Sequence, residues 1–361
     1  PEAVIRDPNV DFAVVGEGER TVCELVEALE HGKPLSGITG LVYKEAGVPV
    51  FNPPRAVIED VDSIPFPAWD LVDMEKYFDA GHRHAANPFP ASNRVVPVFT
   101  SRGCPYGCIY CHNIFGKRIR MRSAENVLRE IELLSERYAP DEIEVSDDIF
   151  NCDMDRVIRI CDGLIGSGSK AALSFPNGLR VDRMDRELVL KLKQAGTKQI
   201  YYAIESADPE VQKRIGKNLD LSKAEEIVRF TAGSGIVTGG FFIFGFPGET
   251  KEEMRKTVEF AKALPFHVAV FHYLTPRPNT PLEALLRKRG IKLDSSGLHH
   301  YKKFSVNLSA VSDAELKRMW AGAYAGFYLR PGQMWRIWKA LPDKARLLRR
   351  IPQVLGFSIT R

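Results

Sequence analysis

The sequence lacks any run of about 18 consecutive apolar residues, which excludes a transmembrane helix of ordinary length. It also lacks an initial Met and a basic segment followed by an apolar one. We therefore expect no secretory signal, and we expect the natural start to lie upstream of Pro1. Neither low hydrophobicity nor a large net charge is present, since 44% of the 361 residues are hydrophobic and the net charge is +4. These values exclude a disordered chain and predict a globular protein of about two domains.

Cysteine is scarce and unevenly placed, which argues against a disulfide-stabilised secreted fold. Three of the six cysteines fall within eight residues, at Cys104, Cys108 and Cys111, whereas the others are isolated, at Cys23, Cys152 and Cys161. A chain of this length needs no disulfides to bury a core. We therefore expect a reducing, cytoplasmic compartment and a metal site at residues 104–111.

Basic residues gather at the C-terminal end. Residues 330–361 contain eight Lys or Arg and one acidic residue, Asp343, and residues 334–350 have the spacing of an amphipathic helix. Three interpretations of this tail stay open: it covers the mouth of a barrel, lies peripherally on an anionic membrane, or is a solvated helix. No RNA-binding module is present, so we expect no nucleic-acid partner.

The central part of the chain alternates short apolar runs with helical segments. We expect strands at 95–100, 142–146, 171–175, 199–205, 238–244 and 267–274, and helices at 123–138, 153–166, 185–195, 222–234 and 250–263. Two of the helices begin with a capping-box pattern, Ser222 with Glu225 and Thr250 with Glu253. The predicted fold class is α/β, with a partial (β/α)6 TIM-type barrel at 93–290.

The flanks predict three further regions. Residues 11–15, 21–30 and 40–44 read as strand, helix and strand, which we interpret as the end of a Rossmann-like α/β domain covering 1–60. A linker rich in Pro and aromatic residues follows at 61–92, and a helical, basic C-terminal region occupies 291–361.

The spacing of Cys104, Cys108 and Cys111 is the strongest chemical signal. Three thiolates spaced in this way converge only if the backbone loops around one centre, and Gly103 and Gly107 allow such a loop. Thiolates bind zinc or iron–sulfur clusters, and structural zinc usually takes four ligands. A fourth cysteine is not nearby. A 4Fe-4S cluster held by three cysteines leaves one iron open for a ligand, so we favour the cluster over a zinc-bound scaffold.

This loop, placed after the first barrel strand, resembles that of radical S-adenosylmethionine enzymes. The resemblance covers about residues 93–290. It implies that a 4Fe-4S cluster on the three cysteines binds S-adenosyl-L-methionine and cleaves it to a 5′-deoxyadenosyl radical, which abstracts hydrogen from a substrate. It also implies a small-molecule or lipid-like substrate and an electron donor such as flavodoxin or ferredoxin.

The resemblance further implies roles for residues that follow the predicted strands. Tyr110 would flank the adenine, and Asp147 and Asp148 would contact the methionine amino group, although either aspartate also suits a helix cap. The remaining implied cofactor contacts are Asn177 and Arg180 near ribose and carboxylate, Glu205 at the fourth strand, and Gly245, Pro247 and Gly248 as close backbone. Arg180 is equally compatible with a surface ion pair, whereas we interpret Glu249 and Thr250 as helix-start residues and not as ligands.

The N-terminal segment resembles the end of the cobalamin-binding domain that precedes the barrel in one branch of this family. That branch includes the anaerobic magnesium-protoporphyrin ester cyclase and cobalamin-dependent methyltransferase types. The Asp-x-His-x-x-Gly pattern of that domain is absent, so we expect the domain to be truncated at the front. The implied reaction is cobalamin-dependent methyl transfer. A radical oxidative cyclisation and an inactive remnant stay open as alternatives.

Overall fold

The computed structural model describes residues 1–79, 94–112, 114–291 and 306–340, which form two compact units. Unit 1 contains residues 1–67, 101–105 and 113–122, and unit 2 contains the rest. Part of the predicted linker and most of the predicted basic tail, from 341 onward, lie outside the described residues. No helix within the described ranges is long and apolar enough to cross a membrane.

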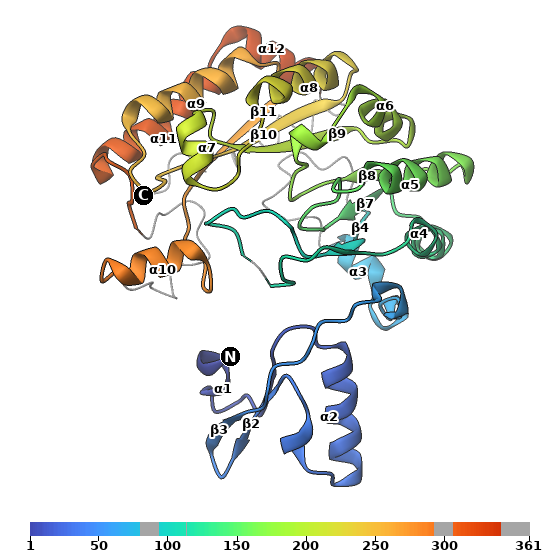
Figure 1. Ribbon diagram of the computed structural model, residues 1–361. Coiled ribbons are helices and arrows are strands. Elements are labelled where there is room, and N and C mark those ends of the chain that lie inside the picture. The colour runs from blue at the N-terminus through green and yellow to red at the C-terminus, as the bar shows by residue number, and fades with distance from the viewer. Residues whose placement is uncertain (80–93, 113, 292–305, 341–361) are drawn as a thin grey trace. The chain divides into compact units, whose positions relative to one another are not determined.

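Unit 1 is a small antiparallel sheet with one long helix (Figure 1). Its elements are α1 (Glu2–Ile5), β1 (Phe12–Val14), α2 (Glu19–His31), η1 (Leu35–Gly37), β2 (Leu41–Glu45), β3 (Val48–Phe51), η2 (Val61–Ser63), β5 (Ser101–Arg102) and β6 (Arg120–Met121). Leu25 and Ala28 of α2 pack on Leu41 and Tyr43 of β2, which accounts for the apolar spacing of both segments. The predicted order strand, helix, strand is confirmed.

The direction of these strands differs from our Rossmann-like expectation. The segment after α2 brings Leu41 back opposite Val14, at the end where β1 finished, so β2 runs against β1. β3 also pairs antiparallel with β2. The described part of unit 1 therefore contains no parallel crossover of the kind that a Rossmann-like unit requires.

Unit 2 has two parallel sheets of three strands each. Their orders are β4 (Val95–Val98), β7 (Glu142–Val145), β8 (Ala172–Ser174), and β9 (Gln199–Glu205), β10 (Val237–Phe244), β11 (Val268–Tyr273), with β7 and β10 central. An isolated parallel bridge pairs Leu179, in the segment after β8, with Tyr202 of β9. All six predicted strands are confirmed within a few residues at each end. Because the strands are parallel, their carboxyl ends gather along one edge.

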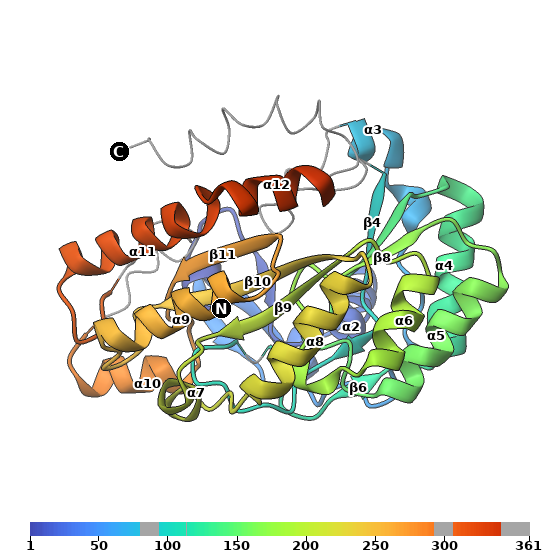
Figure 2. The ribbon, with the colours of Figure 1, turned by 90° about the horizontal axis from the view of Figure 1, so that it is seen from above.

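Helices connect the strands of unit 2 and cover their outer side. They are α3 (Met74–Asp79), α4 (Ala124–Tyr138), α5 (Met154–Gly166), α6 (Arg186–Gln194), α7 (Pro209–Arg214), α8 (Leu221–Gly233), α9 (Lys251–Ala263), α10 (Pro281–Lys288), α11 (Asp313–Tyr328) and α12 (Pro331–Ala340), with the 3-10 turns η3 (Trp69–Leu71) and η4 (Val181–Arg183). Figure 2 shows α4, α5, α6 and α8 following one another around the strands, and α11 beside β11. The alternation of strand and helix confirms the α/β class.

The predicted helix caps are confirmed at one helix and wrong at the other. Thr250 and Glu253 form the expected capping box at α9. At α8 the cap is Asp220, whose carboxylate accepts hydrogen bonds from the backbone N–H groups of Ser222 and Lys223. A carboxylate two residues earlier can reach both orphan N–H groups, so Ser222 lies inside the helix.

Helix α11 closes the exposed edge of β11 with aromatic side chains. The hydroxyl of Tyr324 bonds both the N–H and the C=O of Phe271, at 3.1 Å each. Tyr328 does the same at Ala269, and the indole of Trp320 donates to the C=O of Phe271. Side chains of a helix therefore form the hydrogen bonds of backbone groups that could otherwise pair with another strand.

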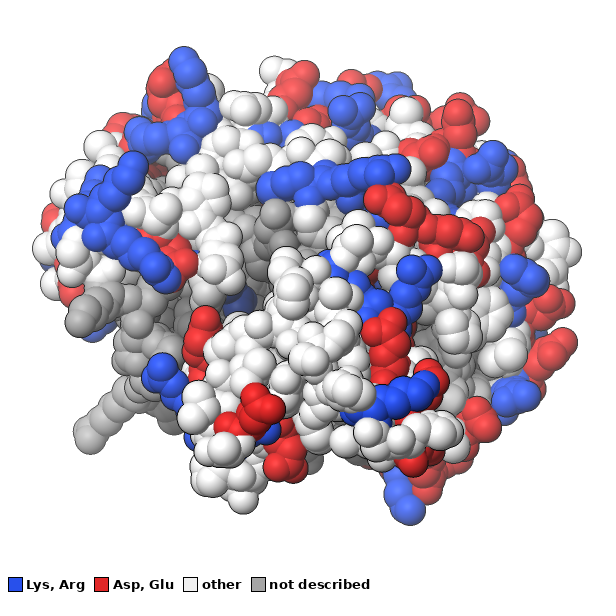
Figure 3. All heavy atoms as spheres, turned by 60° about the horizontal axis from the view of Figure 1, so that its bottom comes forward, with Lys and Arg blue, Asp and Glu red and all other residues white. Residues whose placement is uncertain are grey.

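Charged side chains of both signs are interspersed over the face of the molecule that Figure 3 shows.

Candidate functional site

The first part of the cysteine loop is held inside unit 1. Gly103 has a φ of 88°, and a Cβ on it would lie 2.5 Å from the carbonyl oxygen of Arg118, so only glycine fits there. The backbone N–H of Cys104 donates to Gly116 at 3.3 Å. The two strands that flank the loop, β5 and β6, pair antiparallel and close its base.

A buried ion pair fixes that base. Arg120 of β6 lies 2.7 Å from Oε1 of Glu17, and both side chains are 3% exposed. Glu17 also accepts a hydrogen bond from the backbone N–H of Ile58, and Arg102 of β5 lies 3.3 Å from the same carboxylate. Several donors thus compensate the burial of one carboxylate, which is the condition for a buried charge to be tolerated.

The second part of the cysteine loop is held inside unit 2. The backbone N–H of Ile109 donates to Ile215, and its C=O accepts from Leu282, each at 3.0 Å. The N–H of Cys111 donates to the C=O of Cys108 at 3.4 Å, which makes the chain turn between the two thiols. Both ends of the loop are therefore anchored to surrounding structure.

The three thiols fit a cluster by their chemistry. Cys104, Cys108 and Cys111 are half-buried, and none of them forms a disulfide. Cys104 belongs to unit 1 and the other two to unit 2. Within the described ranges, no three Cys, His, Asp or Glu side chains are already grouped as a metal site. The donor set suits iron–sulfur chemistry, in which soft thiolates are the preferred ligands.

Tyr110 packs on the loop after β10. Its ring lies 5.4 Å from that of Phe246, and both belong to a cluster that includes Ile215 and Leu282. Burial raises the pKa of the Tyr110 phenol, and the charge of Glu205 raises it further. The side chain is thus a neutral ring held between the cysteine loop and the end of β10.

Asp147 and Asp148 follow β7 but have different surroundings. Asp147 is buried, and its carboxylate accepts hydrogen bonds from the N–H and the hydroxyl of Thr100, at 2.6 and 2.5 Å. Asp148 is half-buried, and its carboxylate lies 3.6 Å from Nε2 of His112. The first aspartate therefore ties the end of β4 to that of β7, whereas the second faces the residue that follows Cys111.

Asn177 and Arg180, which follow β8, are engaged with protein groups. The amide of Asn177 donates to the carbonyl oxygens of Ser146 and Asp147, at 3.0 Å each. The guanidinium of Arg180 pairs with Asp182 at 2.8 Å and lies 3.7 Å from the centre of the Tyr106 ring. Of the alternatives open for Arg180, the structure shows an ion pair, but it is half-buried and not at the surface.

Glu205 ends β9 in an unusual conformation. Its φ is 68°, a left-handed value that costs a residue with a side chain roughly 1–2 kcal/mol. Its carboxylate lies 2.9 Å from Nζ of Lys217, and the side chains are 10% and 7% exposed. A strained acid paired with a buried lysine at the end of a strand is a frequent mark of a functional position.

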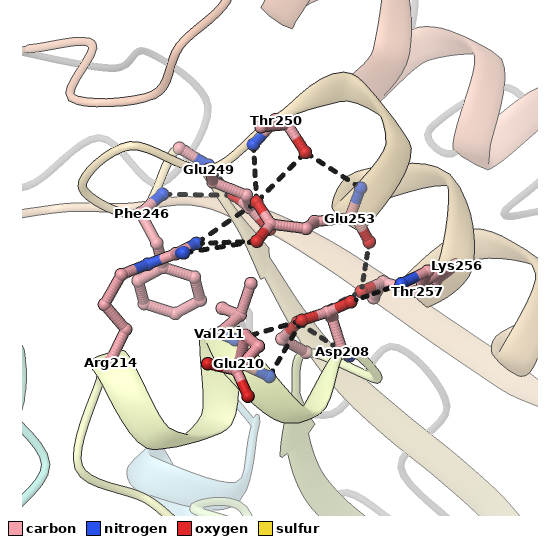
Figure 4. A network of polar contacts seen from close by, with 12 residues as sticks. Asp208, Glu210, Val211, Arg214, Phe246, Glu249, Thr250, Glu253, Lys256 and Thr257 are labelled. Atoms are coloured by element: carbon pink, nitrogen blue, oxygen red, sulfur yellow. Dashed lines mark hydrogen bonds and ion pairs between the residues drawn. The ribbon is translucent and has the colours of Figure 1, made fainter.

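The loop after β10 is built around a buried carboxyl group (Figure 4). Glu249 is fully buried, and one of its oxygens accepts hydrogen bonds from the N–H groups of Gly245 and Phe246, at 2.8 and 3.1 Å. Its other oxygen finds no hydrogen-bond partner among the described residues. Burial raises the pKa of Glu249 to about 8, so the side chain is largely protonated at neutral pH.

The Glu249 carboxyl group lies in the loop that contains the three residues predicted to approach a cofactor, Gly245, Pro247 and Gly248. Gly245 and Gly248 have φ values of 99° and 70°, which glycine adopts without strain. Pro247 between them is half-buried, and the N–H of Gly248 donates to Leu308 at 2.8 Å. The loop is therefore a preformed stretch of backbone beside Tyr110.

Sequence reasoning missed Lys217, Glu249 and Thr100. The sequence places Thr100 at the end of a strand and predicts a helix start at Glu249 and Thr250. Thr250 does cap α9. The Glu249 side chain instead turns back and accepts a hydrogen bond from the preceding loop. The Gly-Phe-Pro-Gly sequence before Glu249 is a usable signal, since a carboxylate after a tight turn can bind the N–H groups of that turn. Lys217 carried no signal of its own.

Comparisons with known proteins agree with these chemical features. The family model described as the radical SAM superfamily matches residues 98–261. An uncharacterized methyltransferase of Pyrococcus horikoshii is 36% identical over 339 residues, covering 92% of this chain and 70% of the relative. The cytidylyl-2-hydroxyethylphosphonate methyltransferase of Streptomyces wedmorensis is 29% identical, covering 87% of this chain and 64% of the relative.

A solved structure has the same fold. The radical S-adenosylmethionine methyltransferase TsrM from Kitasatospora setae, with cobalamin and an iron–sulfur cluster bound, superposes with a TM-score of 0.63 at 21% identity. The match covers 78% of this chain and 54% of that one. The chain thus spans between 54% and 70% of the length of these proteins.

Proposed function

This chain belongs to the radical S-adenosylmethionine superfamily, and from that premise we propose that Cys104, Cys108 and Cys111 hold the family's 4Fe-4S cluster. The observation that carries the proposal is the loop itself, in which three thiols lie within eight residues and both flanks are anchored. When bound, such a cluster supplies the electron that cleaves S-adenosylmethionine and so starts radical chemistry.

The surroundings of the predicted contacts divide them into two groups. We propose that Tyr110, Asp148, Glu205 and the backbone of 245–248 contact S-adenosylmethionine. The other predicted contacts form hydrogen bonds with protein groups and would position the loops around S-adenosylmethionine. They are Asp147, Asn177 and Arg180. Neutral Tyr110 and the apolar side chains around it would exclude water from a reactive species.

The finer architecture is also proposed. Six parallel strands in two sheets, with a parallel bridge from the segment after β8 to Tyr202 of β9, support a partial (β/α)6 barrel over 93–290. In such a barrel the loops at the carboxyl ends of the strands form the reaction chamber. Residues 1–60 would then be a cobalamin-binding-like region that differs from a Rossmann-like unit in its antiparallel strands, 61–92 the linker, and 291–361 the C-terminal region.

The favoured reaction is cobalamin-dependent methyl transfer to a small-molecule or lipid-like substrate. Support comes from the names of the two relatives and from the cobalamin bound in the similar structure. The Asp-x-His-x-x-Gly pattern is absent from residues 1–361, so we propose no cobalamin-ligating residue among them. An electron donor such as flavodoxin or ferredoxin is required, and oxidative cyclisation is the second candidate reaction.

The test is anaerobic reconstitution with iron and sulfide, followed by S-adenosylmethionine and dithionite, with 5′-deoxyadenosine measured by chromatography. We expect product from the wild-type chain and none from Cys104→Ala, Cys108→Ala or Cys111→Ala. Cys23→Ala, at an exposed position on α2, is the matched control and should leave the yield unchanged. A colourless protein holding one zinc, or product formation by Cys104→Ala, would overturn the proposal.

A further inference from the structure

The turn at 215–218 lies directly against the second half of the cysteine loop. Gly216 has a φ of 69°, and a Cβ on it would lie 2.7 Å from the carbonyl oxygen of Gly107. The neighbouring C=O of Ile215 accepts the hydrogen bond from Ile109. Two adjacent residues of the turn thus meet the backbone of the loop between Tyr106 and Tyr110, with no room for a side chain at one of them.

Helix α7, which leads into this turn, is fixed to α9 by two ion pairs (Figure 4). Asp208 caps α7 and lies 2.8 Å from Nζ of Lys256, and Arg214 lies 3.1 Å from the carboxylate of Glu253. Gln212 is buried, and its carbonyl oxygen accepts the N–H groups of Lys217 and Asn218. The turn is therefore a rigid part of unit 2.

Lys217 links the turn to two other strand ends. Its ammonium pairs with Glu205 at the end of β9, and its C=O accepts a hydrogen bond of 2.8 Å from Arg180 after β8. Arg180 lies over the ring of Tyr106, whose hydroxyl accepts a hydrogen bond from Arg183 at 2.9 Å. Tyr106 is the middle residue between Cys104 and Cys108, so these contacts reach the cysteine loop from a second direction.

We propose that the turn Ile215–Asn218 is a positioning element for the iron–sulfur cluster, and that Gly216 is its essential contact. By holding the backbone of Gly107 and Ile109, it sets the direction in which the Cys108 and Cys111 thiols leave the loop. Residues that orient metal ligands typically change metal affinity about 10- to 100-fold when they are altered. The inference rests on the proposed function, because it presumes that these thiols bind a cluster.

The test compares Gly216→Ala with Gly235→Ala in the full chain. Gly235 also has a positive φ, 82°, but a Cβ there would have no atom within 4 Å, so the two variants share the backbone strain and differ in the contact. After reconstitution we measure the loss of iron to a chelator and the electron paramagnetic resonance spectrum with and without S-adenosylmethionine. We expect Gly216→Ala to lose iron about ten-fold faster than Gly235→Ala and to show an altered spectrum with S-adenosylmethionine.

Equal iron retention and equal spectra in the two variants would overturn the proposal. If Gly216→Ala does not fold by circular dichroism, Tyr106→Leu takes its place, with Tyr106→Phe as its control. The Leu variant removes the ring beneath Arg180 and should speed iron loss, whereas the Phe variant keeps that ring and should retain iron. Equal retention by these two would also overturn the inference. Absence of a cluster from wild type and Gly235→Ala alike would instead refute the proposed function.

Discussion

Buried acidic side chains lie at the carboxyl ends of both parallel sheets of unit 2, but their hydrogen-bond and ion-pair partners differ between the two sheets. At the β4–β7–β8 sheet, the buried carboxylate of Asp147 accepts two short hydrogen bonds from Thr100 and is fully used in joining two strands. At the β9–β10–β11 sheet, Glu205 has a left-handed backbone and needs a buried lysine. Glu249 keeps one oxygen without a hydrogen bond among the described residues.

We propose from this difference that the acidic groups at the end of the second sheet take part in function, in addition to the cysteine loop that follows the first sheet. Strained backbone and incompletely paired buried groups persist only where the surrounding structure enforces them, and such sites concentrate where proteins function. The two features of the second sheet lie beside Tyr110 and the turn at 215–218. We therefore expect substitutions at the second sheet to have larger effects, and four predictions test this.

The largest effect is expected for Lys217→Met. The variant leaves the Glu205 carboxylate buried without its partner, which should lower the free energy of unfolding at pH 7 by about 3–5 kcal/mol. Arg229→Met, which breaks an exposed pair with Glu225, is the control and should cost less than about 1 kcal/mol. Urea unfolding measures both, and equal losses would contradict the contrast between the sheets.

A pH-dependent effect is expected for Glu249→Gln. The folded pKa of Glu249 is raised to about 8 from 4.5, so the native state holds a proton that the unfolded chain releases between these values. Wild-type stability should therefore fall as pH rises across this range, and the variant should lack that loss. Relative to pH 5, the variant should gain on the order of 4 kcal/mol over wild type at pH 9.

Two charged side chains act on this carboxyl group: Glu253 raises its pKa, and Arg214 lowers it. Both are present in wild type and variant, so they cancel in the comparison. Urea unfolding at pH 5 and pH 9 gives the difference, with Glu132→Gln at an exposed position of α4 as control. Parallel pH profiles for wild type and Glu249→Gln would contradict the assignment of a buried, protonated carboxyl group.

A smaller effect is expected for Asp147→Ala at the first sheet. The change leaves the N–H and hydroxyl of Thr100 buried without this acceptor, which should cost about 2 kcal/mol of unfolding free energy. Asp148→Ala, at the half-buried neighbour, should cost less. A loss at Asp147 that exceeds the loss for Lys217→Met would reverse the comparison between the two sheets.

The smallest effect is expected for Tyr324→Phe, which tests the cover over the β11 edge. Removal of the hydroxyl should cost about 1 kcal/mol and should speed amide hydrogen exchange at Phe271, whose N–H it accepts. The amide of Ala269, bonded to Tyr328, serves as the internal control and should keep its protection. Unchanged exchange at Phe271 would show that this edge does not depend on the Tyr324 hydroxyl.

Much of unit 2 could be predicted because its signals are local. Apolar runs of strand length, helical spacing and the Thr250 capping box act over a few residues, so six strands and five helices were found close to their bounds. The direction of β2 could not be predicted, since the strand–helix–strand pattern is the same for parallel and antiparallel pairing. The cap at α8 was wrong because Asp220 and Ser222 both suit a cap and only geometry selects one.

The candidate site divides in the same way. The cysteine spacing is a property of eight consecutive residues, and it led to the correct superfamily. The uses of Asp147, Arg180 and Glu249 depend on partners that the sequence does not mark, such as Thr100, 47 positions away from Asp147. Whether a polar side chain meets a cofactor or a neighbouring loop is settled by which strand ends become adjacent.

By itself the sequence determined the strand and helix order of unit 2 and the chemistry of its thiols. The reason is that the periodicity of apolar residues and the type of metal ligand are both properties of short segments. Only the tertiary structure decided that Gly216 must lack a side chain, that Lys217 belongs to Glu205, and that Glu249 turns back into its own loop. Each of these depends on a close approach between segments that separate elements bring together, and no local pattern encodes that distance.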